Sequence, residues 1–248
     1  MSMNLLRRKA AESRPLTDEQ LTIAWQTASL LLDYPDESLP ERLALARRAY
    51  DALPDAVGGP LRATVERLDG VALGDLAADY VETFDSRRRH NLFLTYFAHG
   101  DTRKRGVALL RFKQTYLAAG FEPAPEELPD HLCLVLEFAA TIDREAGRKL
   151  ILDHRAGLEL LRIGLVETGS RWAGAVEAVT ATLPPLRGDE VEAVRRLAAE
   201  GPPEEEVGLT PYATPAFDPG PATPTGPVEL PMPTMPSLPS SVGREGAR

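Results

Sequence analysis

The sequence predicts an all-α protein, with one helical-bundle domain over residues 16–200 and a proline-rich tail after it. Apolar residues recur every three or four positions in successive segments, and glycine, proline or capping residues separate these segments. No Asn-Gly or Asp-Gly hairpin divides runs of alternating apolar and polar residues, as a β-structure would require. Hydrophobic residues make up 43% of the 248 positions, which is enough to fill a core.

The overall charge and the single cysteine limit the possible partners and compartments. A net charge of −9 argues against binding to nucleic acid, whose phosphates need a clustered basic face. The apolar run at residues 132–136 is far shorter than the roughly 18 residues of a spanning helix, and no apolar stretch follows the basic start as in a secretory signal. Cys133 has no partner for an internal disulfide and fits a reducing compartment. We therefore expect a cytoplasmic protein without nucleic-acid partners or stable membrane insertion.

Two capping pairs mark the first helices. Thr17 and Gln20 have the spacing of a capping box and open a helix that stops at Asp33. Ser38 and Glu41 form a second such pair and open a helix whose outer face is expected to carry its arginines.

The segment 60–84 is expected to form two helices broken near Gly70. The second of them should bury Leu73, Leu76, Ala77, Tyr80, Val81 and Phe84. Residues 92–100 are ambiguous between a short helix and a strand, because the apolar run is too brief to show a period. Asp101 is then the expected N-cap of a helix that ends at Gly120.

The stretch ELPDHLCLVLEF, residues 127–138, predicts a central helix that is apolar nearly all round. Pro129 suits the first turn of that helix, and Asp130 suits the positive end of the helix dipole. We expect Asp130 and His131 to lie at the exposed or groove-lining end. Cys133 should be a buried, inert thiol.

Three further helical patterns complete the predicted domain. The first ends at Gly169, the second is capped by Ser170 and runs to Pro184, and the third covers residues 189–200. The apolar stripe of the first contains Leu150, Ile151, His154, Leu158, Leu161 and Leu165.

Both ends of the chain are expected to lack a packed core. Residues 1–15 should form a flexible N-terminus, and residues 201–248 are dense in proline and poor in large apolar residues. Such a tail cannot bury enough surface to offset its ordering entropy, so it should be disordered or locally polyproline II. Its spaced prolines are alternatively typical ligands of a proline-reading domain.

Two basic clusters, at residues 87–89 and 103–105, stand out in this acidic protein. They are either a solvated face or a site for an acidic partner or a phosphate group. Gly106 lies inside a predicted helix, where it costs about 1 kcal/mol relative to alanine. That cost suggests the close approach of another backbone or of a bound peptide.

Sequence signatures of enzymes are absent. There is no phosphate-binding glycine loop, His-Glu-x-x-His, Cys-x-x-Cys or Gly-x-Ser-x-Gly. The histidines lack metal-ligand spacing, although folding could bring His99 and His131 together. We expect no catalysis, resident cofactor or metal. A nucleotide-dependent switch that uses His99, His131 and Asp130 is the alternative.

Four segments resemble one family, the nitrate reductase assembly chaperones of the delta-subunit or NarJ type. These are LLLDYPDE at residues 30–37, YVETFD at 80–85, LFLTYFAHGDTRKRG at 92–106 and ELPDHLCLVLEF at 127–138. The family lies within the all-helical chaperones that serve molybdenum oxidoreductases, so the resemblance implies a single helical bundle of that type.

The resemblance also implies a function. Such a chaperone binds the apo alpha subunit of respiratory nitrate reductase in the cytoplasm, chiefly its N-terminal segment, and assists molybdenum cofactor insertion before membrane docking. The client segment would bind as an amphipathic helix in a groove. A chaperone of another molybdenum oxidoreductase is the alternative.

The resemblance finally implies which residues bind the client. The Pro-Asp-His element of the wider family corresponds to Pro129, Asp130 and His131, and their family role is client recognition. Other candidates for the groove or its shaping loop are Tyr80, Phe84, Asp85, Tyr96, His99, Asp101, Arg103 and Arg105. These residues are alternatively needed to maintain the fold.

Overall fold

The computed structural model describes residues 15–201, and this part of the chain is all helical, as predicted. It contains eleven α-helices, one 3₁₀ helix and no β-strand. The helices are α1 (Asp18–Leu32), α2 (Leu39–Tyr50), α3 (Asp55–Leu68), α4 (Leu73–Phe84), α5 (Tyr96–His99), α6 (Arg103–Ala118), α7 (Leu132–Thr141), α8 (Arg144–Asp153), α9 (Arg155–Glu167), α10 (Ala173–Ala181) and α11 (Gly188–Glu200). The 3₁₀ helix is η2 (Arg88–His90). The predictions for the N-terminus and the proline-rich tail fall on residues 1–14 and 202–248, outside the described residues.

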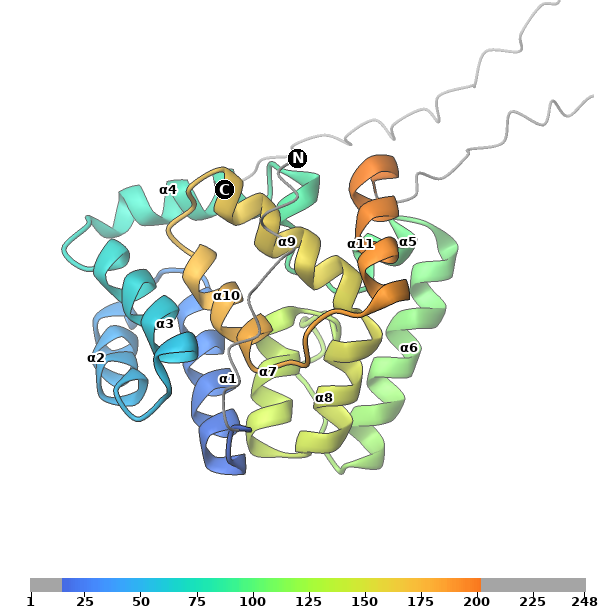
Figure 1. Cartoon of the computed structure of the whole chain (residues 1–248), viewed down its shortest axis with the longest axis horizontal. Coiled ribbons are helices and arrows are strands. Elements are labelled where there is room, and N and C mark those ends of the chain that lie inside the picture. The colour runs from blue at the N-terminus through green and yellow to red at the C-terminus, as the bar shows by residue number, and fades with distance from the viewer. Residues whose placement is uncertain (1–14, 202–248) are drawn as a thin grey trace, which may run out of the picture. The chain divides into compact units, whose positions relative to one another are not determined.

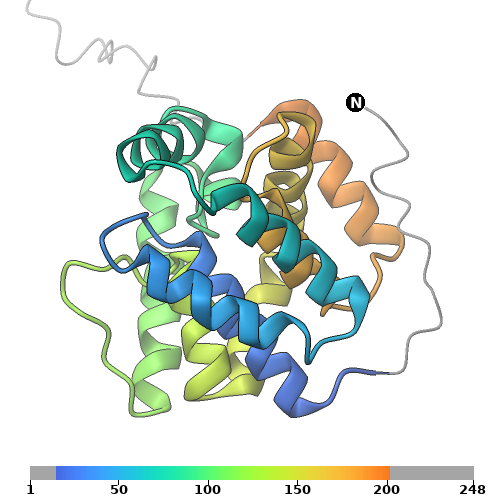
Figure 2. The same ribbon diagram turned by 90° about the vertical axis from the view of Figure 1, so that its left-hand side faces the viewer.

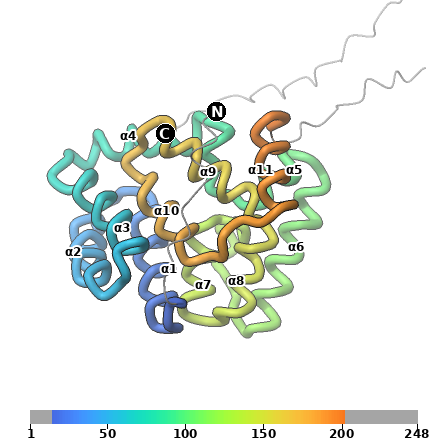
Figure 3. The backbone as a smooth tube through the Cα atoms, viewed as in Figure 1, coloured from blue at the N-terminus to red at the C-terminus, as the bar shows by residue number. Residues whose placement is uncertain are grey.

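Helix α7 lies in the centre of the bundle because nearly every one of its side chains is apolar and buried. It packs between α1 and α8, while α10 packs against α3 and α9 against α11 (Figure 1). Helices α2 and α3 lie side by side (Figure 2). The backbone runs from α4 on one side of the bundle to α5 and α6 on the other (Figure 3).

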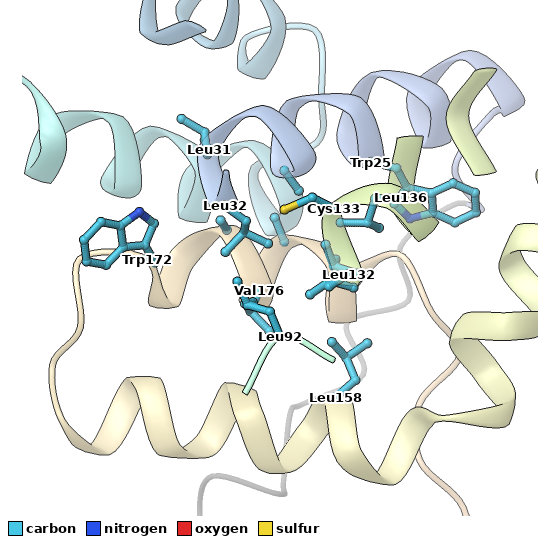
Figure 4. Packing of buried hydrophobic residues seen from close by; sticks show 14 of the residues in the cluster. Trp25, Leu31, Leu32, Leu92, Leu132, Cys133, Leu136, Leu158, Trp172 and Val176 are labelled. Carbon is cyan, nitrogen blue, oxygen red and sulfur yellow. The ribbon is translucent and has the colours of Figure 1, made fainter. Parts of the chain in front are cut away.

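The core is built from the inner faces of α1, α7, α9 and α10 (Figure 4). Trp25 and Trp172 are almost fully buried, and Cys133 packs among leucines at the start of α7. Burial raises the pKa of the Cys133 thiol well above its usual range. The expectation of a buried cysteine is confirmed, and its expected inertness stays a prediction.

The predicted capping box of α1 forms in full, and Ser38 is the N-cap residue of α2 as predicted but without a side-chain cap bond. Thr17 and Gln20 form the expected capping box at α1, with bonds of 3.2 and 3.0 Å. The Ser38 hydroxyl instead donates to the Asp36 carboxylate over 2.5 Å and makes no cap bond to α2. Asp101 and Ser170 are not the N-cap residues of the helices that follow them, which are Thr102 and Trp172. Asp101 instead pairs with the Arg105 guanidinium over 3.2 Å.

Several predicted burial patterns also need correction. Leu73 and Val81 on α4 are exposed, because that helix covers the core with one narrow face. Arg42 on α2 is buried, whereas its arginines were expected on the outside. The apolar stripe that was predicted to be continuous up to Gly169 breaks at His154, which ends α8 and whose ring contacts the Leu150 carbonyl at 2.9 Å.

Two glycines show where helices do and do not meet. A Cβ added at Gly174 on α10 would overlap the Pro60 carbonyl oxygen of α3, so this glycine allows the two helices to touch. At Gly106 on α6 an added Cβ would meet nothing within 4 Å among the described residues. The expected close approach of another backbone to Gly106 is therefore not found in residues 15–201.

No helix within residues 15–201 has both the length and the apolar character needed to cross a bilayer. The same described part of the chain contains no group of three or more His, Cys, Asp or Glu side chains that could hold a metal ion.

Candidate functional site

The Pro-Asp-His element forms a buried corner before α7. The first helical residue is Leu132 and the N-cap is His131, so Pro129 and Asp130 precede the helix and do not lie in its first turn. The Pro129 carbonyl accepts a 2.6 Å hydrogen bond from the Tyr116 hydroxyl. Asp130 is fully buried, which corrects the expectation that its side chain lies at an exposed end.

Asp130 joins three segments of the chain through one carboxylate oxygen. That oxygen accepts bonds from the backbone N–H of Thr95 at 3.1 Å and from the Thr95 hydroxyl at 2.5 Å. Arg105 on α6 lies 3.6 Å from it and donates to the same hydroxyl over 3.2 Å. The carboxylate is thus neutralised and hydrogen-bonded inside the protein, as a buried charge requires.

The backbone at this corner forms a short clip. The Leu94 N–H donates to the Asp130 carbonyl over 3.0 Å, and the Leu132 N–H donates to the Leu92 carbonyl over 2.9 Å. Phe93 and His131 face each other across the clip as an isolated antiparallel bridge. The segment that was ambiguous between helix and strand therefore contains both a bridge residue, Phe93, and the short helix α5.

The ring of His131 is half-buried against an aromatic neighbour. The centroids of the His131 and Phe93 rings are 5.2 Å apart. The guanidinium of Arg105, a residue of α6, lies 5.3 Å from the centroid of the Phe93 ring. Burial lowers the pKa of His131, while the carboxylates of Asp33, Asp130 and Glu127 act in the opposite direction. The imidazole is therefore neutral at pH 7.

The α1–α2 loop extends this corner toward solvent. The buried guanidinium of Arg42 donates to the carbonyls of Leu30 and Tyr34 over 3.2 and 2.6 Å. It also pairs with Asp33 and Asp36, each at 3.1 Å. The end of α1 that leads into this loop is close to α7, because the Ser29 hydroxyl donates to the Cys133 carbonyl over 2.9 Å.

Tyr34, at the tip of that loop, is an exposed aromatic residue. Its side chain is 47% exposed, and its ring meets the ring of Tyr80 edge to face at a centroid distance of 5.4 Å. Tyr34, Asp33 and Arg42 were not among the predicted site residues, although the first two lie in the segment LLLDYPDE. The signal that could have found them was the acid-rich loop followed by an arginine one helical turn into α2.

The predicted residues of α4 differ in accessibility. Tyr80 is buried and its hydroxyl donates to the Leu32 carbonyl over 2.9 Å, while burial raises its pKa. Phe84 is buried against Trp172 at a centroid distance of 5.5 Å. Asp85, at the end of α4, is exposed. The structure thus places Tyr80 and Phe84 in the core and Asp85 on the surface.

The predicted residues near α5 and α6 also divide into buried and exposed groups. Tyr96 is buried, with the Arg105 guanidinium 6.0 Å from its ring. His99 is half-buried, and its pKa is lowered first by burial and then by His154, Lys104 and Arg111. Asp101 and Arg103 are exposed. His99 is the last residue of α5, whereas His131 precedes α7 and its ring packs against Phe93.

We define the acidic aromatic strip as the surface residues around this corner. Its aromatic members are Tyr34, Phe93 and His131, and its acidic members are Asp33, Asp36 and Glu127. Tyr34 is exposed, and Phe93 and His131 are half-buried. The strip thus combines aromatic side chains with carboxylates, of which Asp33 and Asp36 pair with Arg42.

A comparison with known protein families points to the same family as the four sequence segments. The model of the family described as nitrate reductase delta subunit matches residues 50–178, which is more than half of the chain. The chain belongs to this family. The resemblance predicted from the four sequence segments is confirmed.

Relatives of this delta-subunit family protein include two that are named as assembly chaperones. The probable nitrate reductase molybdenum cofactor assembly chaperone NarJ of Bacillus subtilis is 34% identical over 67% of this chain and 90% of its own length. The NarJ chaperone of Escherichia coli K12 is 32% identical over 58% of this chain and 63% of its own. These names agree with the expectation that the chain is not an enzyme.

Two further matches are a larger protein and a solved structure. The nitrate reductase-like protein NarX of Mycobacterium tuberculosis is 39% identical over 68% of this chain, and the chain spans only a quarter of that protein's length. A solved structure of a putative redox enzyme maturation protein from Archaeoglobus fulgidus is 22% identical, with a TM-score of 0.47, over 69% of this chain and 96% of that one.

Proposed function

We propose that this protein is a system-specific chaperone for respiratory nitrate reductase. It binds the apo alpha subunit in the cytoplasm, chiefly by its N-terminal segment, and assists molybdenum cofactor insertion before the subunit docks at the membrane. In this proposal, the helical domain over residues 16–200 binds the client and catalyses no reaction. Family membership and the names of the two NarJ relatives support the choice of nitrate reductase over another molybdenum oxidoreductase.

The observation that carries the proposal is the acidic aromatic strip. Exposed Tyr34 and half-buried Phe93 provide apolar contact area, and the exposed acidic residues Asp33, Asp36 and Glu127 belong to the α1–α2 loop and to the segment before α7. An amphipathic client helix gains affinity from the apolar anchors, while the charges set its orientation and association rate. The strip therefore selects for a client segment with basic residues beside an apolar face.

We assign the predicted site residues to two roles. His131, Asp85 and Asp101 reach the surface and contact the client directly, together with Tyr34. The buried residues Asp130, Tyr80, Phe84 and Tyr96 position that surface from below, and Arg105 links Asp130 to Asp101. Arg103 and His99 lie at the α5–α6 end of the corner, where they border the site.

A calorimetric titration tests the proposal. The titrant is a synthetic peptide from the N-terminus of the nitrate reductase alpha subunit of the same organism, and we expect saturable binding near one-to-one. Replacing Tyr34→Ala removes an exposed aromatic anchor and should weaken binding about tenfold, since such anchors contribute more than about 1 kcal/mol. Its effect on the melting temperature should be small because Tyr34 is exposed.

Ile142→Ala is the matched control. Ile142 is 48% exposed, nearly the same as Tyr34, but it lies just after the opposite end of α7. We expect the control to bind the peptide like the unchanged protein. If the unchanged protein, Tyr34→Ala and Ile142→Ala bind the peptide with equal affinity, the strip is not the binding site. If the folded, unchanged protein does not bind the peptide, the client-segment proposal itself is contradicted.

A further inference from the structure

Helix α6 lies on the outer edge of the bundle (Figure 1). It presents a line of apolar side chains to solvent. Val107, Leu110 and Leu117 are 62%, 53% and 61% exposed. Together with Gln114 they are spaced by three, four and three residues, which is the a/d spacing of a coiled-coil heptad. The opposite face of α6 is the one that packs on the bundle, through Phe112 and Tyr116.

Basic residues border this line on both sides. In the heptad that places Val107 and Gln114 at a, Lys104 and Arg111 take e positions and Lys113 takes a g position. None of these three has a carboxylate partner among residues 15–201. Helix α6 contains no acidic residue, although the protein as a whole has a net charge of −9.

Gly106 adds space for a close neighbour. It occupies the g position before Val107, and an added Cβ there would meet nothing within 4 Å in the described part of the chain. A glycine in a helix interior costs about 1 kcal/mol relative to alanine. Contacts within residues 15–201 do not explain that cost, whereas the approach of a further helix would.

We propose that the outer face of α6 is a docking surface for an acidic, amphipathic α-helix of a partner protein. The partner helix presents apolar residues at its own a and d positions toward Val107, Leu110 and Leu117, and glutamates or aspartates at e and g toward Lys104, Arg111 and Lys113. Gln114 at a core position favours one register of the pair. This surface differs from the acidic aromatic strip, whose charge selects a basic segment.

Charge decides between this partner and two other occupants. A second copy paired α6 to α6 would place lysines and arginines opposite each other, which is unfavourable. An anionic membrane would attract α6 but repel the rest of a protein with a net charge of −9, since an extended surface acts on the whole molecule. A single acidic helix meets only the basic face of α6.

The test uses two synthetic three-heptad peptides with leucine at a and d. One carries glutamate at every e and g position, and the other carries lysine there, so like-charge repulsion keeps each peptide from pairing with itself. Fluorescence anisotropy with the full chain should give a Kd for the glutamate peptide at least about tenfold lower than for the lysine peptide. Added salt should reduce that preference.

The double charge reversal Arg111→Glu with Lys113→Glu provides the decisive comparison. We expect it to invert the preference, so that the lysine peptide now binds about tenfold better than the glutamate peptide. Leu110→Ala should weaken both, and Tyr34→Ala on the strip should change neither. All these side chains are exposed, so circular dichroism should show an unchanged helix content.

Three outcomes would overturn the proposal. Equal binding of the two peptides, or none, removes the acidic helix as the occupant. A concentration-dependent dimer that Leu110→Glu abolishes in sedimentation assigns the face to a second copy. The third outcome is that the protein binds neither peptide but co-sediments with phosphatidylglycerol vesicles, and that the double charge reversal abolishes this co-sedimentation. That result would assign the face to a lipid surface.

Discussion

Thr95 binds Asp130 twice, through its backbone N–H at 3.1 Å and its hydroxyl at 2.5 Å, although the two residues are 35 positions apart. Both bonds end on the same oxygen, and the other carboxylate oxygen has no hydrogen-bond partner among the described residues. This pair fixes the approach of α5 and α6 to the start of α7. Asp130 therefore stabilises the corner on which the proposed client surface is built.

Replacing Asp130→Ala should destabilise the protein. The change leaves the Thr95 donors and the largely buried Arg105 guanidinium without their carboxylate, at a cost of about 3 kcal/mol. The melting temperature should fall by roughly 8 °C, measured by circular dichroism. Asp101→Ala is the control, because it removes the exposed carboxylate partner of the same arginine and should cost less than about 1 kcal/mol. Equal stability of the two variants would contradict the role of Asp130 at this corner.

Replacing Arg42→Ala should loosen the α1–α2 loop. Arg42 is buried and binds two carbonyls and two carboxylates of residues 30–36, so its loss should cost about 2–3 kcal/mol. Hydrogen exchange at residues 33–38 should become faster. The exposed Arg48 on the same helix serves as the control, and Arg48→Ala should leave the exchange rates unchanged.

Two glycine substitutions should have opposite effects on stability. Gly174→Ala places a methyl group against the Pro60 carbonyl and should destabilise the protein by about 2 kcal/mol. Gly106→Ala has free space around it and should stabilise α6 by about 1 kcal/mol through helix propensity. Urea unfolding measures the free energy of unfolding of both variants. A change of the same sign in the two variants would contradict this prediction.

Stability should fall as the pH drops below about 6.5. Burial lowers the pKa of both His131 and His90, so the folded state favours their neutral forms. This contribution is complete above the unfolded value of 6.5 and is lost as the pH falls from there through the lower folded pKa. The loss of unfolding free energy between pH 7.5 and 5.5 should be smaller in His131→Phe. An identical loss in that variant would exclude His131 as a contributor.

The thiol of Cys133 should be unreactive in the native protein. It is buried, and its raised pKa disfavours the thiolate, which is the reactive form. A chromogenic disulfide reagent should label it only in denaturant, at the same midpoint as the loss of helicity. Labelling of the folded protein at the rate of a free thiol would show that the start of α7 opens.

Local patterns predicted the helices well, since the stop at Asp33, the end at Gly120 and the apolar character of α7 depend on neighbouring residues alone. Ser38 lies at the predicted N-cap, but its hydroxyl binds the neighbouring Asp36 and not the helix end. Asp130 was misplaced because its carboxylate binds Thr95, a residue 35 positions away, inside the protein. Such a distant partner is selected by tertiary packing. A pattern of spacing does not contain that information.

The residues of the proposed site were predicted unevenly for the same reason. The motifs indicated segments that contact one another in the fold, but not which side chain of each segment reaches the surface. Tyr80 and Tyr34 show the difference: both belong to quoted motifs, their rings touch, and only Tyr34 is exposed. The sequence indicated a basic cluster at residues 103–105, but it did not single out Arg111 and Lys113, and the exposure of Leu110 beside them became evident only in the fold.

The clip between Phe93 and His131 brings together the two ends of a long segment of the chain. The chain leaves the clip at Leu94 and returns to it at Asp130, so α5, α6 and the following loop form an excursion whose two ends are adjacent. Because these ends are already joined at the clip, a change of length in the loop between α6 and α7 costs little additional loop-closure entropy. Phe112 and Tyr116 hold α6 against the bundle. The clip thus separates the length of the connection from the position of α7.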